Sequence, residues 1–241
     1  MQIILNDDEI KYLEEIADKL NVSTIRYLEK KWNKEGEKMI KKIIDARKEE
    51  IINSCEKLYK NNNFKDITIK SIGEETSFSR TSIYNYFQTK EEIFLALFTR
   101  EYEIWIGDLN KMYEQNSTMT KEEFAVKLAT TISKRKNLLK LLSMNMYDME
   151  ENSRMEELTE FKKAYGNSMK MVRKCIDKFF NTMSEDKKDE FIFLFFPFMY
   201  GIYPYAEVTE KQKQAMSDAD VPFKYLTIYE ITYKGILQFL K

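Results

Sequence analysis

Residues that interrupt helices are scarce in this chain. Only 6 glycines and 3 prolines occur among 241 residues, whereas Leu, Lys, Glu, Met and Ile are abundant. Turn-rich sheet proteins need more glycine and proline, and the abundant residue types favour helix. Apolar residues also recur at helical spacing, as between Ile51 and Tyr59, and no segment sustains the alternation typical of a strand. We therefore expect an all-α fold.

Helix starts can be located from Ser, Thr or Asn followed three positions later by Glu or Gln, the pattern of a capping box. It occurs at Asn6, Thr89, Thr120, Ser153 and Thr209. With the apolar spacing, it predicts a helical segment up to about Met39, a three-helix unit over 40–87 and a long helix from Lys90 to about Gln115. Further helices are expected near 120–133, 136–148, 153–182, 185–203, 210–218 and 222–240. Pro204 is expected to end the apolar helix.

The chain contains no histidine. This excludes Ser-His-Asp and Cys-His nucleophile pairs, imidazole metal sites and the usual general base near neutral pH. Cys55 and Cys175 are far apart and have no metal-binding spacing, and Cys55 lies in step with apolar residues, which predicts a buried thiol. We expect a reducing compartment, no enzyme activity, no cofactor and no metal.

The formal net charge of -1 gives no global basic signature, so contact with nucleic acid must depend on a local patch. Residues 30–48 supply a basic stretch. Its basic residues are Lys30, Lys31, Lys34, Lys38, Lys41, Lys42, Arg47 and Lys48, and its acidic residues are Glu35, Glu37 and Asp45. A solvated helix face is the alternative explanation for such a run.

Residues 191–206 are uncharged, which raises the question of a membrane. The run is shorter than the roughly 20 residues that cross a bilayer as a helix, and it contains Pro197, Gly201 and Pro204. A helix buried inside protein is favoured. The amino terminus, MQIILNDDE, lacks the basic start and long apolar stretch of a secretory signal, so we expect a cytoplasmic protein with no membrane partner.

Residues 68–87 have the spacing of a helix-turn-helix, with a break at 76–78 between two short helices. The first helix is expected to start from Thr68 and the second from Ser79. Gly73 supplies the small side chain needed where the helices cross. The inward face is predicted to consist of Ile69, Ile72, Phe78, Ile83 and Phe87. The second helix is predicted to expose side chains that can hydrogen-bond base edges without negative charge, namely Arg80, Thr81, Ser82, Tyr84 and Asn85.

This stretch closely resembles the TetR (tetracycline repressor) family of transcriptional regulators. The resemblance covers about 50 residues, from the helix over 45–60 through ITIKSIG at 67–73 to SRTSIYNYFQTKEEI at 79–93. It fits that family's T-x-x-x-I-A start, V-S-x-x-T-x-Y recognition helix and Y-F-x-x-K-E-x-L exit. Two positions depart from the pattern: Ser77 stands where many members have Gly, and Gly73 where they have Ala. Both substitutions are compatible with the same docking on DNA.

The resemblance implies a dimeric regulator, a repressor in our interpretation, that binds palindromic double-stranded DNA. It implies base or groove contacts from Thr81, Ser82, Tyr84 and Asn85, and phosphate contacts from Thr68, Ser79, Arg80, Tyr86 and Lys90. Arg47 is also expected to contact DNA. Lys90 has independent support because it opens a helix whose free N–H groups favour a phosphate. For Tyr84 and Tyr86 the alternative is that one ring packs beneath the unit.

In TetR-like regulators the carboxy-terminal region binds the inducer and forms the homodimer. Its soft and aromatic side chains suit a small apolar or aromatic effector, although core packing is the simpler explanation for them. The candidate lining is Met144, Tyr147, Phe180, Met199, Tyr200 and Tyr203. By family analogy, the helices over 191–203 and 223–240 form a four-helix dimer interface.

Three domains are therefore expected: a helical extension over 1–39, a DNA-binding domain over 40–89, and a ligand-binding and dimerisation domain over 90–241. The extension is atypical for the family. Its residues 13–29 themselves resemble a helix-turn-helix, with Ala17 at the crossing and 21–23 as the turn, while a helical brace or basic arm is the favoured alternative. Two rival functions remain: a histidine-free helical enzyme, and a membrane-surface protein that docks through 191–206.

Overall fold

The computed structural model describes residues 11, 12, 15, 34–144 and 146–241, and over this part of the chain the structure is helical, without strands. The prediction of an all-α fold is confirmed. The capping pattern at Asn6 and the second helix-turn-helix over 13–29 fall wholly or largely outside the described residues. Two compact units divide the chain, residues 1–97 and 98–241. The units divide at Leu97 and not at the expected boundary near Thr89.

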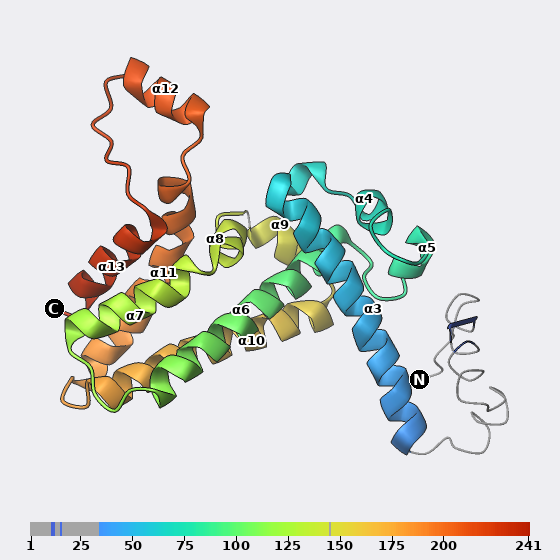
Figure 1. The fold of residues 1–241 in the computed structure, drawn as a ribbon, viewed down its shortest axis with the longest axis horizontal. Coiled ribbons are helices and arrows are strands. Elements are labelled where there is room, and N and C mark those ends of the chain that lie inside the picture. The colour runs from blue at the N-terminus through green and yellow to red at the C-terminus, as the bar shows by residue number, and fades with distance from the viewer. Residues whose placement is uncertain (1–10, 13–14, 16–33, 145) are drawn as a thin grey trace. The chain divides into compact units, whose positions relative to one another are not determined.

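The first unit contains α3 (Lys34–Asn61), a single turn of 3-10 helix, η1 (Phe64–Asp66), and the short helices α4 (Ile69–Gly73) and α5 (Arg80–Ile83). It also contains the start of α6 (Lys90–Glu114). Helix α4 packs against both α3 and α5 (Figure 1). The Phe94 ring meets Tyr59 and Phe64 edge-on, with ring centroids 5.2 and 4.8 Å apart. These contacts explain why the first turns of α6 belong to this unit.

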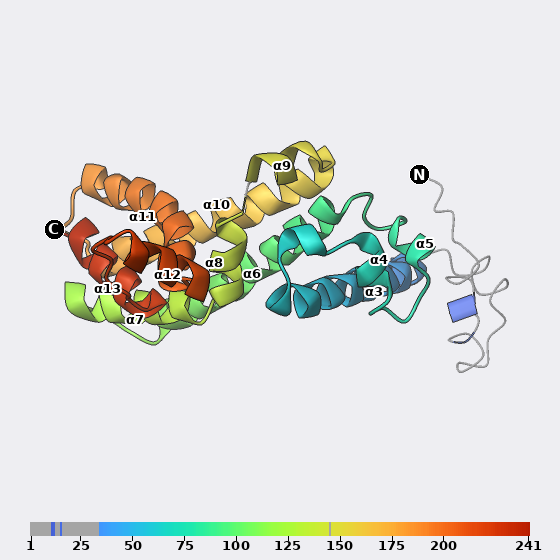
Figure 2. The same ribbon diagram turned by 90° about the horizontal axis from the view of Figure 1, so that it is seen from above.

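The second unit continues from α6 through seven further helices: α7 (Lys121–Ser133), α8 (Lys136–Leu142), α9 (Met146–Glu151), α10 (Met155–Phe179), α11 (Glu185–Ala206), α12 (Glu210–Asp218) and α13 (Ile228–Phe239). Helix α13 packs on α7 and α11, and α11 also packs on α8 and α10 (Figure 2). Helix α12 projects from this unit and contains no buried residue (Figure 1).

Aromatic side chains fill the core of the second unit. Trp105 on α6 is fully buried, lies 6.1 Å from the Phe196 ring, and donates its indole N–H to Thr131 Oγ1 at 3.0 Å. Both cysteines are buried free thiols, as predicted for Cys55. Burial raises the pKa of Cys175 to about 12, which keeps this thiol protonated and unreactive near neutral pH.

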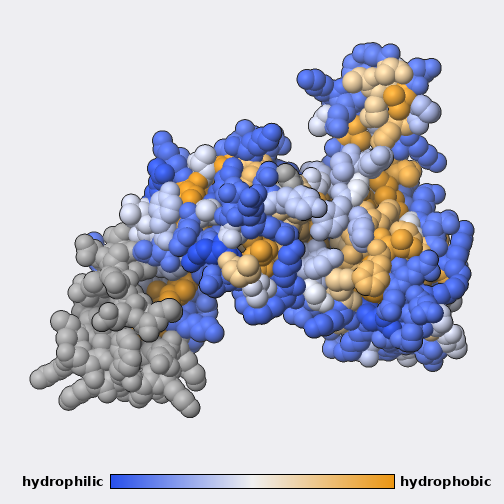
Figure 3. Space-filling model, turned by 180° about the vertical axis from the view of Figure 1, so that it is seen from behind, coloured by the Kyte–Doolittle hydropathy of each residue, from blue (hydrophilic) through white to orange (hydrophobic). Residues whose placement is uncertain are grey.

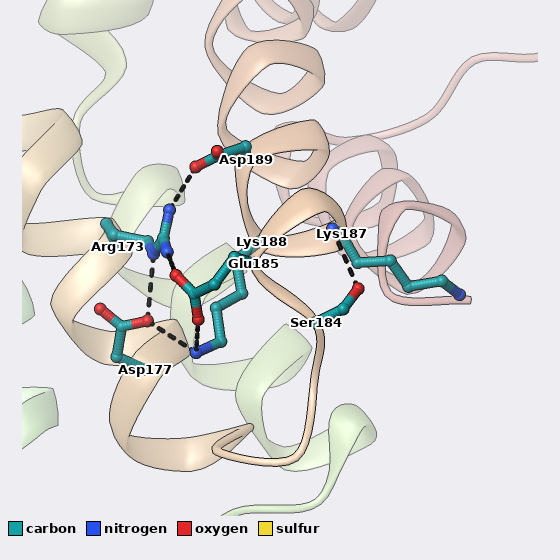
Figure 4. Close-up of polar contacts among 7 residues, drawn as sticks. All are labelled: Arg173, Asp177, Ser184, Glu185, Lys187, Lys188 and Asp189. Atoms are coloured by element: carbon teal, nitrogen blue, oxygen red, sulfur yellow. Dashed lines mark hydrogen bonds and ion pairs between the residues drawn. The ribbon is translucent and has the colours of Figure 1, made fainter.

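An ion-pair cluster joins the end of α10 to the start of α11 (Figure 4). The Arg173 guanidinium contacts the carboxylates of Asp177, Glu185 and Asp189, with its Nε 3.0 Å from Asp177 Oδ1. Lys188 Nζ lies 3.0 Å from Asp177 and 2.8 Å from Glu185. Burial alone would raise the pKa of Asp177, but hydrogen bonds from Lys188 and Arg173 outweigh it and lower that pKa. The cluster therefore stabilises the α10–α11 turn with Asp177 ionised.

The capping pattern located several helix starts correctly. Thr120 and Thr209 form complete capping boxes with Glu123 and Gln212, and Thr89 Oγ1 accepts the Glu92 N–H at 3.2 Å. The prediction for Ser153 is wrong. Its hydroxyl donates to the Met149 carbonyl at 2.7 Å, which closes α9 instead of opening α10.

Three predicted boundaries also differ from the structure. The helix expected over 136–148 is broken after Leu142, where the Ser143 hydroxyl donates back to the Lys140 carbonyl. Helix α11 does not end at Pro204, because the Glu207 N–H reaches the Tyr203 carbonyl at 2.8 Å and completes the turn around the proline. The last helix begins only at Ile228, where Thr227 and Glu230 form a capping box.

Among the described residues, no single helix is long and apolar enough to cross a membrane. Helices α11 and α12 meet that test only as a pair bent by 84°.

Candidate nucleic-acid interface

Two short helices with the predicted limits form a helix-turn-helix. Helix α4 begins after Thr68, whose hydroxyl accepts the Ser71 N–H at 3.1 Å, while Ser71 completes a capping box. Helix α5 begins after Ser79. Ile72, Ile83 and Phe87 are fully buried, as predicted for the inward face, whereas Ile69 and Phe78 are half-buried. The motif therefore packs as the sequence indicated.

Gly73 lies at the crossing of α4 and α5. A Cβ atom at this position would lie 3.2 Å from the Cβ and 3.3 Å from the Cα of Arg80. These distances are shorter than most real Cβ contacts, so an added Cβ would require Arg80 to shift by a few tenths of an ångström. The predicted need for a small residue here is confirmed.

Helix α5 and the turn after it expose Arg80, Thr81, Tyr84 and Asn85. The Arg80 guanidinium donates to the Tyr84 hydroxyl at 3.5 Å, so these two side chains lie side by side. No acidic residue occurs in α5 or in the turn that follows it. This surface can donate and accept hydrogen bonds without repelling phosphate.

Two residues expected to contact DNA are instead buried. Ser82, predicted to be exposed, is only 5% exposed, and its hydroxyl lies 3.0 Å from that of Ser79. That prediction is wrong because Ser82 lies on the side of α5 that faces the unit. Tyr86 is 6% exposed and packs beside Phe78, with ring centroids 6.4 Å apart. Of the two tyrosines, Tyr86 is therefore the one that packs beneath the unit.

Lys90 opens α6 as predicted, but its ammonium group is already engaged. It donates to the Phe64 and Ile67 carbonyls at 3.0 and 3.2 Å and lies 4.1 Å from the centroid of the Phe64 ring. The buried Glu92 carboxylate also accepts the Gln88 N–H at 2.7 Å, close to the start of the helix. Lys90 thus links α6 to η1, and at most one of its three N–H groups remains for a phosphate.

Arg47 on α3 is likewise held by protein groups. Its guanidinium lies between the rings of Tyr12 and Phe78, 4.8 and 4.5 Å from their centroids, and donates to Ser77 Oγ at 3.4 Å. Glu50, one helical turn along α3, accepts the Ser77 N–H at 2.5 Å. This support of the turn by Glu50 was not predicted from the sequence. Arg47 and Glu50 lie three positions apart on one face of α3, and this spacing could have indicated that both contact the same turn.

The six candidate pocket residues do not gather at one place. Tyr147 is 85% exposed, and Phe180 packs edge-on against Phe124 with ring centroids 5.1 Å apart. Phe180 precedes α11, whereas Met199, Tyr200 and Tyr203 lie near its far end, on the order of 20 Å along the axis. Met144 is half-buried between α8 and α9.

Tyr200 does lie in an aromatic environment with Tyr102 on α6 and Tyr165 on α10. The pKa of Tyr102 is raised well above its ordinary value. Burial is the largest cause, and the neighbouring Tyr200 and Tyr165 add to it. The pKa of Tyr200 is raised by burial and then by Tyr165 and Glu150. All three phenols therefore remain neutral near neutral pH and are suited to hydrogen bonding. Tyr102 and Tyr165 were missed because their spacing is that of an ordinary core.

Two family models match the chain. Residues 51–97 match the model described as bacterial regulatory proteins, tetR family, and residues 99–228 match the tetracyclin repressor-like C-terminal domain. An uncharacterized HTH-type transcriptional regulator of Bacillus subtilis (strain 168), YfiR, is 31% identical over 80 residues. That match covers 33% of this chain and 39% of YfiR, so it spans about two fifths of the relative's length.

Two solved structures have a similar fold. The fatty acid degradation regulator FadR from Bacillus halodurans superposes with a TM-score of 0.51 at 13% identity, over 80% of this chain and 94% of that one. FadR from Thermus thermophilus, a TetR family transcriptional repressor in complex with lauroyl-CoA, gives a TM-score of 0.52 at 14% identity, over 80% and 93%. At these identities the likeness concerns the fold alone.

Proposed function

The chain belongs to the TetR family of regulatory proteins, and from that premise we propose that it is a cytoplasmic repressor that binds palindromic operator DNA as a homodimer and is released by a small molecule. A transcriptional regulator of this family needs a DNA-reading element. The observation that carries the proposal is the exposed face of α5, with Arg80, Thr81, Tyr84 and Asn85 and no carboxylate.

The exposure of each side chain guides its proposed role. Thr81, Tyr84 and Asn85 read base edges in the major groove, because they are exposed and carry both donors and acceptors. Arg80, Ser79 and Thr68 contact phosphates. Ser82 and Tyr86 support α5 from below, while Arg47 and Lys90 fix the turn and the start of α6 and contribute positive potential rather than open phosphate contacts.

A homodimer is supported by apolar side chains that the second unit leaves exposed on α11. Phe193 is 70% and Leu194 46% exposed, and Pro197, Tyr200 and Pro204 continue the same face at helical spacing. Figure 3, which views the molecule from behind, shows apolar surface on the second unit below the projecting α12. We propose that α11 and α13 pair with their copies in the partner. Two recognition helices would then enter successive major grooves, about 34–36 Å apart.

The effector proposal rests on the tyrosine environment around Tyr200. A small molecule with an apolar or aromatic body would pack among Phe196, Tyr165 and Tyr102 and hydrogen-bond to the neutral phenols. The complex of Thermus thermophilus FadR with lauroyl-CoA shows that a neighbour of the same fold holds a ligand with a long apolar part. Met199, Tyr200 and Tyr203 remain in the proposed lining, whereas Tyr147 and Phe180 do not.

Selection of bound duplexes from a random DNA library tests the function. We expect enrichment of a palindrome, followed by loss of preference at defined base pairs for Asn85→Ala and Thr81→Ala. Asn167→Ala, on the exposed face of α10, is the matched control and should select the same sequence as the unchanged protein. Failure to enrich any duplex at low salt would contradict the proposal.

A further inference from the structure

The second unit contains a cavity of about 390 Å³ between α6 and α7, apart from the tyrosine environment just described. Three lysines line it: Lys111 from α6, Lys127 from α7, and Lys134 immediately after α7. The acidic residue of the lining is Asp108. This volume falls in the range of about 300–1,000 Å³ that is usual for small-molecule sites.

The lysines of the cavity differ from most others that the structure describes in this unit. Lys136, Lys162 and Lys188 each contact a carboxylate at 2.6–3.0 Å. Within the described chain, Lys111, Lys127 and Lys134 are exposed and have no ion-pair or hydrogen-bond partner. All three line one cavity, so together they give it a positive potential that attracts a small anion.

Asp108 does not supply that anion because Arg135 already offsets its charge. The Arg135 Nη2 atom lies 3.5 Å from Asp108 Oδ2, and both side chains are about one-fifth exposed. The pair is long and poorly aligned: among the described residues, neither Asp108 Oδ2 nor Arg135 Nε has a hydrogen-bond partner, although both atoms are buried. The cavity therefore keeps a positive potential next to polar atoms that are not fully satisfied.

We propose that the cavity between α6 and α7 binds a small polyanion carrying phosphate or carboxylate groups. Lys127 and Lys134 bind the anion from α7 and its end, and Lys111 binds it from α6. Helix α6 is continuous from Lys90 to Glu114, so the ligand contacts the same helix that begins in the DNA-binding unit. This site is separate from the apolar effector site proposed above, and its test does not require operator DNA.

Isothermal titration of the full chain with inorganic pyrophosphate and with citrate, at physiological ionic strength, tests the site. We expect saturable binding of at least one anion with a stoichiometry of one per chain. The double variant Lys127→Gln, Lys134→Gln should bind roughly tenfold more weakly, since two charged contacts are removed. The control pair Lys170→Gln, Lys211→Gln removes the same charge elsewhere and should bind as the unchanged protein does.

Two further readouts separate a binding role from a structural one. Without ligand, the Lys127→Gln, Lys134→Gln protein should melt at the same temperature as the unchanged protein, because both side chains are exposed. Asp108→Asn should bind the anion more tightly, because Arg135 is then unopposed. Arg80→Gln should leave the affinity unchanged, which excludes the helix-turn-helix as the anion site.

The preferred anion identifies the class of ligand. Stronger binding of pyrophosphate points to a phosphate ester or anhydride, and stronger binding of citrate points to a polycarboxylate. Absence of saturable binding for both, or equal weakening by the control pair, overturns the proposal.

Discussion

The Glu50 carboxylate accepts the backbone N–H of Ser77 at 2.5 Å, so α3 holds the turn of the helix-turn-helix from outside the motif. Arg47, one turn earlier on α3, donates to the side chain of the same serine. Many TetR-like regulators have glycine at this turn position. Here Ser77 occupies that position. Its backbone N–H donates to Glu50, and its hydroxyl oxygen accepts from Arg47.

Glu50→Ala should destabilise the first unit by about 1–2 kcal/mol, because a charge-assisted hydrogen bond to a backbone N–H is lost. Amide hydrogen exchange at Ser77 should accelerate in this variant, and urea unfolding measures the loss in stability. Glu50→Gln retains an acceptor and serves as the control. Unchanged exchange at Ser77 in the alanine variant would show that the turn does not depend on α3.

Lys90→Ala should lower stability as well as DNA affinity, because it removes the donor that joins the Phe64 and Ile67 carbonyls. The expected loss is about 1–3 kcal/mol, the usual effect of leaving such groups unpaired. Arg80→Gln should instead leave stability unchanged and reduce the slope of log affinity against log salt by about one unit. If Lys90→Ala instead reduces this salt slope and leaves thermal unfolding unchanged, Lys90 contacts a phosphate directly and does not stabilise the fold.

The ring of Phe198 on α11 packs directly against Gly235 on α13. A Cβ atom at this glycine would lie 2.5 Å from the ring, which requires the ring or the helix to shift. Overpacking costs about 1–3 kcal/mol, and the higher helix propensity of alanine offsets up to about 1 kcal/mol. Gly235→Ala should therefore reduce the free energy of unfolding by about 1 kcal/mol in urea titrations. In a Phe198→Ala background the same change should be neutral or stabilising.

Acid should weaken the cluster at the α10–α11 turn (Figure 4). Because the pKa of Asp177 is lower in the folded than in the unfolded chain, its contribution is present above the unfolded value of about 3.9 and is lost as pH falls through the folded value. Asp177→Asn should flatten the decline of melting temperature in this acidic range. A decline of equal steepness in both proteins would assign the acid sensitivity to other carboxylates.

Phe193→Glu should convert the proposed dimer into monomer, because it places a charge on the exposed apolar face of α11. Analytical ultracentrifugation at micromolar concentration measures the change. Ile104→Glu is the matched control, since Ile104 is also exposed but lies on α6. If the unchanged protein sediments as a monomer, the proposed dimer itself is wrong.

Local patterns predicted most of the fold. Capping residues such as Thr120 and Thr209 act within one helical turn, so their effect can be read from neighbouring positions. Ser153 shows the limit of this reasoning, because its hydroxyl can serve either the preceding or the following helix. The helix-turn-helix was predictable for the same local reason, as Thr68, Gly73 and Ser79 act through adjacent residues.

The parts of the site that were not predicted depend on contacts between distant segments. Lys90 was expected to face a phosphate, but carbonyl groups more than twenty positions earlier bind its ammonium. Similarly, Ser82 and Thr81 are both polar, and only the packing of α5 decides which of them is buried. The polar cavity between α6 and α7 was also not predicted from the sequence, because lysines at these spacings are typical of a solvated helix face.

Trp105 is an intrinsic fluorescence probe of the second unit. It is one of two tryptophans in the chain, is fully buried among phenylalanine rings, and donates its indole N–H to Thr131, a residue that also lines the α6–α7 cavity. Its fluorescence should therefore be blue-shifted in the folded protein and sensitive to any change in that hydrogen bond. A molecule that enters the cavity can thus be followed by emission alone, without a label or a known operator.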